Sequence, residues 1–264
     1  MTVPLFQVDA FTNRKFHGNP AAVCPLTEWL DDEVLLAVAA ENNLSETAYF
    51  VAEDGGYRLR WFTPRSEVNL CGHATLASAF VLLTILQPER QDVSFSTRSG
   101  KLTVRRDGNW LRMDFPALVP WECVDPPAAL LKGLGLRKDQ ASVLQLKDNF
   151  FVVYRSEDNV RSLQPDLAQL ETLHPAGVCV TAPGKNVDFV SRYFAPSYGI
   201  PEDPVTGSTH CSLTPYWTKR LGKSQLQARQ VSPRGGDLQC EMVGDRVLLK
   251  GQAVLTMQGS LLIG

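Results

Sequence analysis

The chain has no long hydrophobic run, no excess of either charge and no paired-cysteine motif. Its longest apolar stretches fall far short of the roughly 20 residues that a membrane-spanning helix needs, and no basic and apolar leader follows Met1. A net charge of -2 gives no overall attraction for nucleic acid or for an anionic membrane. The 6 cysteines are scattered without a CxxC pair, which predicts free thiols in a reducing compartment. We therefore expect a cytoplasmic protein that binds a small molecule, with no nucleic-acid or membrane partner.

What the sequence does contain is an internal repeat, half a chain length apart. Residues 60–64 (RWFTP) recur as residues 192–196 (RYFAP), and residues 72–75 (GHAT) are answered by residues 207–210 (GSTH). A third match, RSGKL with RGGDL, follows in the same order. Three matches in one order predict a duplicated lobe. We expect the two lobes to be related by a pseudo-twofold axis and the functional site to lie in the cleft between them.

Each half is predicted to be rich in strands around one long apolar helix. In the first half, alternating patterns predict strands up to residue 63, interrupted by an amphipathic helix over 29–42. Residues 73–86 are helical in length and apolar on most sides, which predicts a buried helix, and strands follow through residue 115. This plan is α+β and differs from a Rossmann sheet.

A proline-rich stretch from Pro116 to Pro127 marks the boundary between the lobes. We therefore predict an N-terminal lobe over 1–118 and a C-terminal lobe over 119–264, with the last strand able to pair back with the first lobe. The second lobe repeats the plan, with helices near 165–173 and from about 208 to 221.

Each long helix is predicted to begin at a glycine. Gly72 opens the first helix, and Gly207 with Ser208 opens the second. Backbone N–H groups at a helix start attract anions, and glycine lets a ligand approach the backbone closely. One such start is typical of a structural turn, whereas two starts aimed into one cleft predict a site for a small carboxylic acid.

Three titratable residues are candidates for chemistry. Glu46 follows Ser45 at a predicted strand start among small and apolar neighbours, where a carboxyl with a raised pKa serves as a general acid or base. His73 occupies the first turn of a helix, where the dipole disfavours the charged imidazole, so we expect it to be neutral. Asp203 precedes Pro204 just before the second helix. Taken singly, each residue is more typical of a structural or capping role.

Several motifs together resemble the phenazine-biosynthesis isomerase family, the PhzF-like proteins, which have the diaminopimelate epimerase fold. They are SETAYF, EVNLCGHAT, RYFAP and EDPVTGS, with the opening VDAFTNRKFHGNPAAV, and the similarity covers essentially the whole chain. The resemblance implies two alike lobes, each a curled, mostly antiparallel sheet around a central helix. It also implies a homodimer that needs no cofactor.

The same resemblance implies an activity and a set of site residues. The predicted reaction is an isomerisation in which general acid/base catalysis moves a proton between carbons of a small carboxylic acid, whose identity the sequence does not specify. The catalytic residues carried over by motif are Glu46, His73 and Asp203. The substrate-binding residues carried over are Ser45, Gly72, Gly207 and Ser208.

One departure from the epimerase relatives bears on the reaction. Those enzymes carry a cysteine before the glycine in each lobe, because racemisation requires two opposed bases. Here Cys71 fills one position and Thr206 the other. We therefore do not expect a two-thiol racemase.

Three other interpretations use the same residues. A zinc site built from Cys71, His73, His210 and Cys211 lacks the usual ligand spacing, so we predict no metal. A Cys71 nucleophile beside His73 lacks a third residue to orient the histidine. A non-catalytic module that binds a small carboxylate or a protein partner has no need of Glu46, His73 and Asp203 together.

Overall fold

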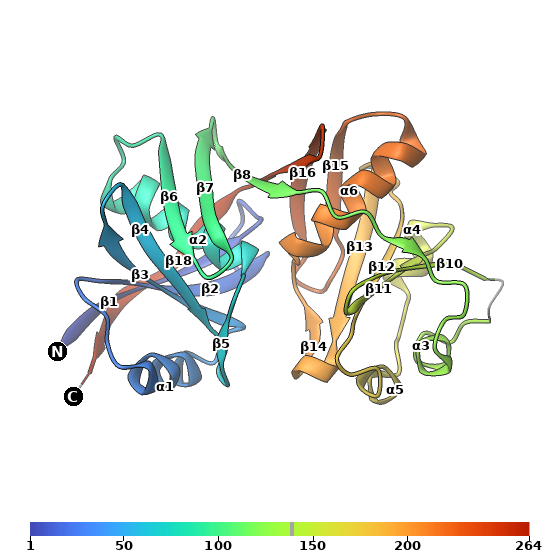
Figure 1. Cartoon of the computed structure of the whole chain (residues 1–264), viewed down its shortest axis with the longest axis horizontal. Coiled ribbons are helices and arrows are strands. Elements are labelled where there is room, and N and C mark those ends of the chain that lie inside the picture. Colours follow the sequence, from blue (N-terminus) through green and yellow to red (C-terminus); the bar gives the residue numbers. More distant parts are fainter. Residues whose placement is uncertain (138–139, 264) are drawn as a thin grey trace. The chain divides into compact units, whose positions relative to one another are not determined.

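The chain divides into two units, and the first of them contains both ends of the chain. The computed structural model describes residues 1–137 and 140–263 (Figure 1). The first unit comprises Met1–Asp114 and the segment that begins at Leu248, and the second comprises Phe115–Val247. We had placed the C-terminal segment in the second lobe with the option of pairing back. It belongs to the first unit because β18 (Ala253–Leu262) forms a long antiparallel ladder with β1 (Thr2–Ala10).

The sheet of the first unit runs outward from β1. Strand β1 lies between β18 and β2 (Asn19–Leu26) and is antiparallel to both. Strand β2 is parallel to β3 (Glu46–Glu53), which is antiparallel to β4 (Gly56–Phe62). Strand β4 is antiparallel to β5 (Glu67–Val68) and parallel to β6 (Asp92–Thr97). The antiparallel strands β7 (Gly100–Asp107) and β8 (Trp110–Pro116) complete the series.

The second unit repeats this pairing scheme. Strand β9 (Trp121–Glu122) is antiparallel to β10 (Ser142–Leu146), which is antiparallel to β11 (Asn149–Val153). Strand β11 is parallel to β12 (Gly177–Pro183), and β12 is antiparallel to β13 (Phe189–Ala195). Strand β13 is antiparallel to β14 (Ile200–Asp203) and parallel to β15 (Gln225–Gln230). Strand β16 (Gly236–Val243) is antiparallel to β15, and the next strand, β17 (Arg246–Gly251), begins in the second unit and ends in the first.

The order of parallel and antiparallel neighbours is thus the same in both units, as the sequence repeat predicts. The repeat also carries a matching ion pair. Arg60 donates to both carboxylate oxygens of Glu67 at 2.8 and 2.7 Å, and Arg192 donates to both of Glu202 at 2.8 and 3.0 Å. Each guanidinium also lies over the phenylalanine two residues further along the chain, at 5.0 and 4.9 Å. Each arginine thus joins its own strand to the next strand of the same unit.

The two long predicted helices are present, and both begin at the predicted glycines. Helix α2 (Gly72–Phe80) continues as a π-helical turn, η1 (Val81–Leu86), and α6 spans Gly207–Leu221. Neither N-cap residue, Cys71 or Thr206, caps its helix with its side chain. The first-turn N–H groups of α2 and α6 therefore lack the side-chain acceptor that many helix starts have.

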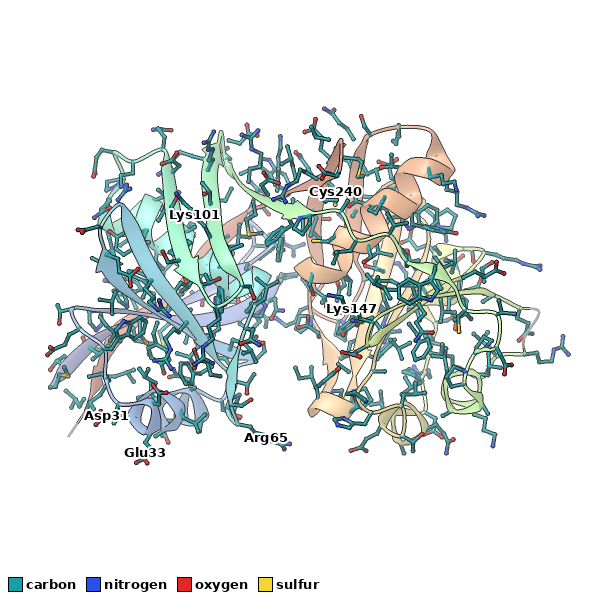
Figure 2. The ribbon with its side chains drawn as sticks, in the orientation of Figure 1. Asp31, Glu33, Arg65, Lys101, Lys147 and Cys240 are labelled. Atoms are coloured by element: carbon teal, nitrogen blue, oxygen red, sulfur yellow. The ribbon has the colours of Figure 1, made fainter. Side chains whose placement is uncertain are left out.

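The remaining helices are short and lie at the surface of each unit. Helix α1 (Asp32–Asn42) begins three residues later than predicted, and the N-cap residue Asp31 and the first-turn residue Glu33 extend outward (Figure 2). Helix α5 (Leu167–Glu171) is shorter than predicted. Helices α3 (Ala128–Gly133) and α4 (Glu157–Arg161) and the 3₁₀ turn η2 (Pro196–Tyr198) were not predicted, because one or two turns leave no clear period in the sequence.

The state of the cysteines and the length of the helices bear on the expected free thiols and on membrane spanning. All 6 cysteines are unbridged, and all except Cys123 are buried. Within the described residues, no helix is both long enough and apolar enough to cross a membrane.

The turn between β1 and β2 depends on Gly18. This residue has φ +65°, and a Cβ added there would lie 2.2 Å from the carbonyl oxygen of Ala10. We expect Gly18→Ala to lower the free energy of unfolding by clearly more than the roughly 1 kcal/mol that a left-handed backbone costs a non-glycine residue. The matched control is Gly55→Ala, since Gly55 has φ +79° and open space around it. Urea unfolding followed by circular dichroism measures both losses, and equal losses would contradict the predicted clash.

Candidate active site

Two of the predicted catalytic residues meet in the first unit. Glu46 opens strand β3, and His73 lies in the first turn of α2. The carboxylate Oε2 of Glu46 is 3.2 Å from Nε2 of His73, and the two side chains are only 13% and 7% exposed. The two atoms are in contact but are not aligned as a linear hydrogen bond. Catalytic contacts of this kind often align only when a substrate is bound.

The second ring nitrogen of His73, Nδ1, contacts the side chains of two other residues. Nδ1 of His73 lies 3.2 Å from the side-chain nitrogen of Asn19 and 3.5 Å from Sγ of Cys71. Asn19 is fully buried at the start of β2, and its side-chain oxygen accepts a hydrogen bond of 3.3 Å from the hydroxyl of Ser45. Asn19 was assigned no role from the sequence. Its place in the GNP segment of a quoted motif was the available signal.

His73 is neutral, as predicted, but burial is the main cause. Loss of solvent around the ring lowers the pKa of His73 to about 3, because the charged imidazolium is poorly solvated inside the protein. Burial thus favours the uncharged form of the ring. The dipole of α2, which we had invoked, acts in the same direction.

In the second unit, Asp203 is held in the turn that precedes α6. The hydroxyl of Thr206 donates to Oδ2 of Asp203 at 2.5 Å. The side-chain amide of Gln230, on β15, accepts from the Thr206 N–H at 2.9 Å and donates to the Asp203 carbonyl at 2.7 Å. All three side chains are buried. Gln230 therefore joins the candidate site as a residue that shapes the turn, and the sequence carried no signal for it.

The helix start at Gly207 combines buried and exposed groups. Gly207 is buried, whereas the side chain of Ser208 is exposed. The carbonyl of Thr206 accepts hydrogen bonds from the Thr209 hydroxyl at 2.9 Å and from Nδ1 of His210 at 2.8 Å. Burial also lowers the pKa of His210, to about 4, so this histidine is a neutral part of the scaffold.

The predicted site residues thus form two groups, one in each unit. Ser45, Glu46, Gly72 and His73 lie at the adjoining starts of β3 and α2 in the first unit. Asp203, Gly207 and Ser208 lie on one continuous turn and helix start in the second. That both groups face one cleft stays a prediction.

The metal interpretation meets a geometric difficulty. Glu46, Cys71 and His73 each offer a ligand atom, and these atoms lie within 4.8 Å of one another. However, Glu46 contacts Nε2 of the imidazole and Cys71 contacts Nδ1, and these two ring nitrogens point in different directions. Zinc needs its ligand atoms to converge at about 2.0–2.3 Å, so this arrangement suits a proton-handling pair better than a zinc site.

The other residues of the zinc hypothesis are engaged elsewhere. His210 directs Nδ1 to the carbonyl of Thr206, and Cys211 directs Sγ to the carbonyl of Gly207, within their own helix. Both side chains are buried. Neither belongs to the cluster around His73 that the structure describes.

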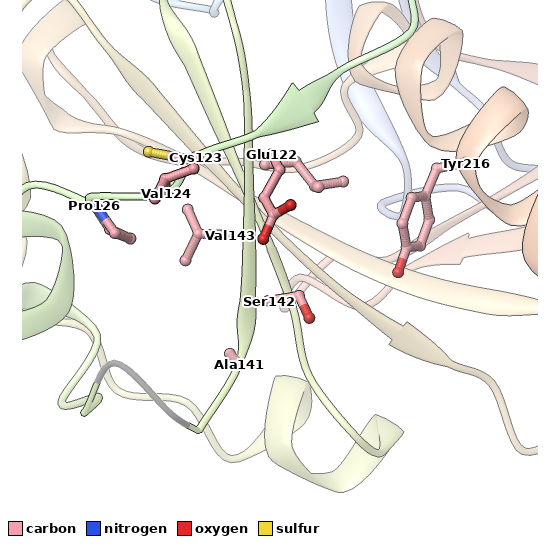
Figure 3. A pocket seen from close by; sticks show the side chains of 9 residues that line it. Glu122, Cys123, Val124, Pro126, Ala141, Ser142, Val143 and Tyr216 are labelled. Atoms are coloured by element: carbon pink, nitrogen blue, oxygen red, sulfur yellow. The ribbon is translucent and has the colours of Figure 1, made fainter.

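A separate cavity in the second unit has little catalytic potential. It has a volume of about 500 Å³ and lies between strand β10 and the chain segment before α3 (Figure 3). Its walls include Glu122, Cys123 and Tyr216. Burial raises the pKa of the Cys123 thiol, which works against a reactive thiolate. None of the predicted site residues lines this cavity.

Comparison with known proteins supports the motif-based resemblance. The profile of the family described as phenazine biosynthesis-like protein (PhzC-PhzF) matches residues 8–259. An uncharacterized isomerase of Pseudomonas aeruginosa is 54% identical over 261 residues, which cover 99% of each chain. The crystal structure of a PhzF-family phenazine biosynthesis protein from Enterococcus faecalis has a TM-score of 0.94 at 44% identity and 100% coverage of both chains.

More distant structures bear on the fold alone. A predicted epimerase from Pseudomonas aeruginosa has a TM-score of 0.74 at 21% identity, covering 99% of this chain and 100% of its own. The α+β class and the diaminopimelate epimerase-like fold are thereby confirmed.

Proposed function

Since the chain belongs to the PhzF-like family of phenazine biosynthesis-like proteins, we propose that it is a cofactor-independent isomerase that moves a proton between carbons of a small carboxylic acid. The observation that carries this proposal is the buried contact between the Glu46 carboxylate and the neutral imidazole of His73. A carboxylate beside a neutral N–H donor is equipped to accept a proton and to give it back. The isomerase name of a relative that is 54% identical points to the same class of reaction.

Glu46 is the proposed proton carrier. As a carboxylate it takes a proton from one carbon of the substrate, and the C–H bonding electrons move into the adjoining unsaturated system. The protonated Glu46 then returns the proton to a second carbon, where a new C–H bond forms. Substrate and product have the same atoms, and the enzyme ends in its starting state. No oxidant or reductant is required.

The role that we propose for His73 differs from the direct catalytic one that the motifs imply. Both of its ring nitrogens instead contact protein groups, Nε2 facing Glu46 and Nδ1 facing Asn19 and Cys71. We therefore propose that His73 orients the Glu46 carboxylate and stabilises its charge. Because the pKa of His73 is about 3, the ring does this as a neutral donor.

The second unit is proposed to bind the substrate's polar groups. The uncapped N–H groups at the start of α6, near Gly207, suit a carboxylate, and the exposed hydroxyl of Ser208 adds a further donor. Asp203 is proposed to contact a substrate amino or hydroxyl group, with Thr206 keeping its carboxyl in position. In the first unit, the N–H groups near Gly72 and the hydroxyl of Ser45 are proposed to contribute in the same way.

Solvent deuterium tests the reaction class. The purified protein is incubated in D₂O with a panel of cyclic unsaturated amino and hydroxy carboxylic acids, and proton NMR follows the loss of carbon-bound hydrogen. We expect enzyme-dependent exchange, or a shift of the double bond, in at least one acid. Acids that bind, by calorimetry, yet show neither exchange at any carbon nor a shift of the double bond would instead support a non-catalytic carboxylate-binding module.

The cysteine alternative predicts a different response to Cys71→Ala. Cys71 is buried, and its Sγ contacts Nδ1 of His73, the same ring nitrogen that the Asn19 amide contacts. On the proposed mechanism, Cys71→Ala keeps turnover within about threefold of wild type, whereas loss of a nucleophile costs about 10⁴- to 10⁶-fold. The deuterium assay measures this directly. A loss of the larger size in a folded variant would make Cys71 the reacting group.

A further inference from the structure

We propose that Asn19 is a positioning residue that holds His73 in a single tautomer, with its proton on Nε2, and so fixes the donor that faces Glu46. The inference deepens the proposed function, on which its catalytic meaning rests. It concerns the free protein, however, and can be tested without a substrate. Asn19 belongs to neither the catalytic nor the substrate-binding residues that the family motifs supplied.

The hydrogen bonds of the Asn19 amide define its orientation. Its oxygen accepts the hydroxyl hydrogen of Ser45 at 3.3 Å, and its nitrogen lies 3.2 Å from Nδ1 of His73. An amide nitrogen has only hydrogens to offer. Nδ1 of His73 must therefore be the acceptor, and the ring proton of a neutral imidazole must sit on Nε2.

The Glu46 carboxylate favours the same position for the ring proton. Oε2 of Glu46 lies 3.2 Å from Nε2 of His73. A carboxylate at that distance is attracted to an N–H group and repelled by a nitrogen lone pair. The reverse tautomer would therefore oppose an ionised Glu46. The amide orientation and the charge of Glu46 thus favour the same tautomer.

Asn19 has little freedom to move away from His73. Its side chain is fully buried, and its backbone pairs with Ala10 in the β1–β2 ladder. The preceding Gly18 packs against the Ala10 carbonyl in a left-handed conformation. Cys71 also contacts Nδ1 of His73, but at 3.5 Å and through a weak thiol donor. Asn19 is therefore the main partner that determines which ring nitrogen carries the proton.

The result is a chain of donors that runs in one direction. The hydroxyl of Ser45 donates to Asn19, Asn19 donates to His73, and His73 presents its remaining N–H to Glu46. Orienting the imidazole through its second nitrogen is the usual way in which proteins set the behaviour of the first. Here the group that contacts the second ring nitrogen, Nδ1, is the amide of Asn19, which carries no charge and cannot take the ring proton.

Nitrogen-15 NMR of the histidine rings tests the proposal on the intact protein. The titratable groups that contact His73 are Glu46 from β3 and Cys71 ahead of α2. We expect His73 in the wild type to show the Nε2–H tautomer throughout pH 6–8. His210 is an internal control, because its Nδ1 donates to the Thr206 carbonyl and it must show the opposite tautomer. The spectra of His73→Gln and His210→Gln assign the two signals. A wild-type His73 with its proton on Nδ1 would overturn the proposal.

Substitution of Asn19 supplies the second arm. In Asn19→Asp the side chain can only accept, so the His73 proton is expected to move to Nδ1 or the ring to become doubly protonated. Retention of the wild-type tautomer in folded Asn19→Asp would contradict the assigned role. Ser45→Ala covers the case in which that variant fails to fold. It removes the donor that holds the Asn19 oxygen and is expected to yield a mixture of both tautomers, and an unchanged spectrum would count against the directed chain.

These outcomes are separable from the proposed reaction. If the tautomer is as expected but loss of the Glu46 carboxylate leaves turnover intact, the reaction assignment fails and the positioning role stands. If His73 has its proton on Nδ1 while Glu46 is still required for turnover, the positioning role of Asn19 fails and the reaction assignment stands.

Discussion

Replacement of Glu46 with Gln is expected to lower the rate of proton transfer by about 10²- to 10⁴-fold, because the general acid/base is lost. Glutamine has nearly the same shape, and its oxygen can still face Nε2 of His73 in this largely buried position. The packing of β3 against α2 is therefore expected to survive. What the amide cannot do is accept a proton from carbon.

The measurement is the deuterium exchange assay, with an acid that the wild-type protein processes. Glu53→Gln is the matched control, since Glu53 ends the same strand and is exposed to solvent. That variant is expected to keep full turnover. Glu46→Asp retains a carboxylate but withdraws it by one methylene group, so we expect activity between the two. A folded Glu46→Gln protein that turns over at the wild-type rate would refute the proposed mechanism.

Replacement of Trp217 with Ala is expected to destabilise the protein by about 3–5 kcal/mol, the usual cost of emptying a large aromatic site in a core. Trp217 lies on α6, and none of its surface is exposed. Its ring stacks on Phe189 with a centroid distance of 5.7 Å and an interplanar angle of 7°, and its indole N–H donates to the Thr181 hydroxyl at 3.0 Å. Both partners come from neighbouring strands, β13 and β12, so the loss would loosen α6 from its sheet.

Urea unfolding followed by circular dichroism measures this loss. Trp121→Ala is the control, because Trp121 is 54% exposed and surface substitutions usually change stability by no more than about 0.5 kcal/mol. Trp217→Phe keeps an aromatic ring but removes the hydrogen bond, and we expect an intermediate loss. Equal stability of the Trp217→Ala and Trp121→Ala proteins would show that α6 is anchored in some other way. Because α6 begins at Gly207, the same substitution is also expected to weaken ligand binding.

The fold was predictable from sequence wherever the signal was local or repeated. The RWFTP and RYFAP segments lie on equivalent strands, and each places its arginine on a glutamate of the next strand. The glycines at 72 and 207 open the long helices, and the residue before each glycine is extended and not helical. Short helices such as α4 escaped prediction because five residues are too few to show a period.

The residues of the candidate site were recognised in the sequence only in part. Glu46 and His73 stood out because they lie in motifs of the family that the chain resembles. Asn19 and Gln230 did not stand out, because a buried amide gains its meaning only from partners far away in the chain. Gln230 lies 24 or more residues beyond the turn that it holds. The direction in which His73 presents its nitrogens was likewise invisible, and it changed the proposed role of that residue.

The sequence by itself determined the duplicated α+β plan and the glycine-led helices. These follow from residue order, periodicity and side-chain chemistry, all of which are present before the chain folds. Only the tertiary structure decided that the C-terminal strand returns to β1, and that His73 stands between Glu46 and Asn19. The reason is that strand partners and buried hydrogen bonds are chosen among many chemically equivalent groups by packing in three dimensions, which no local pattern records.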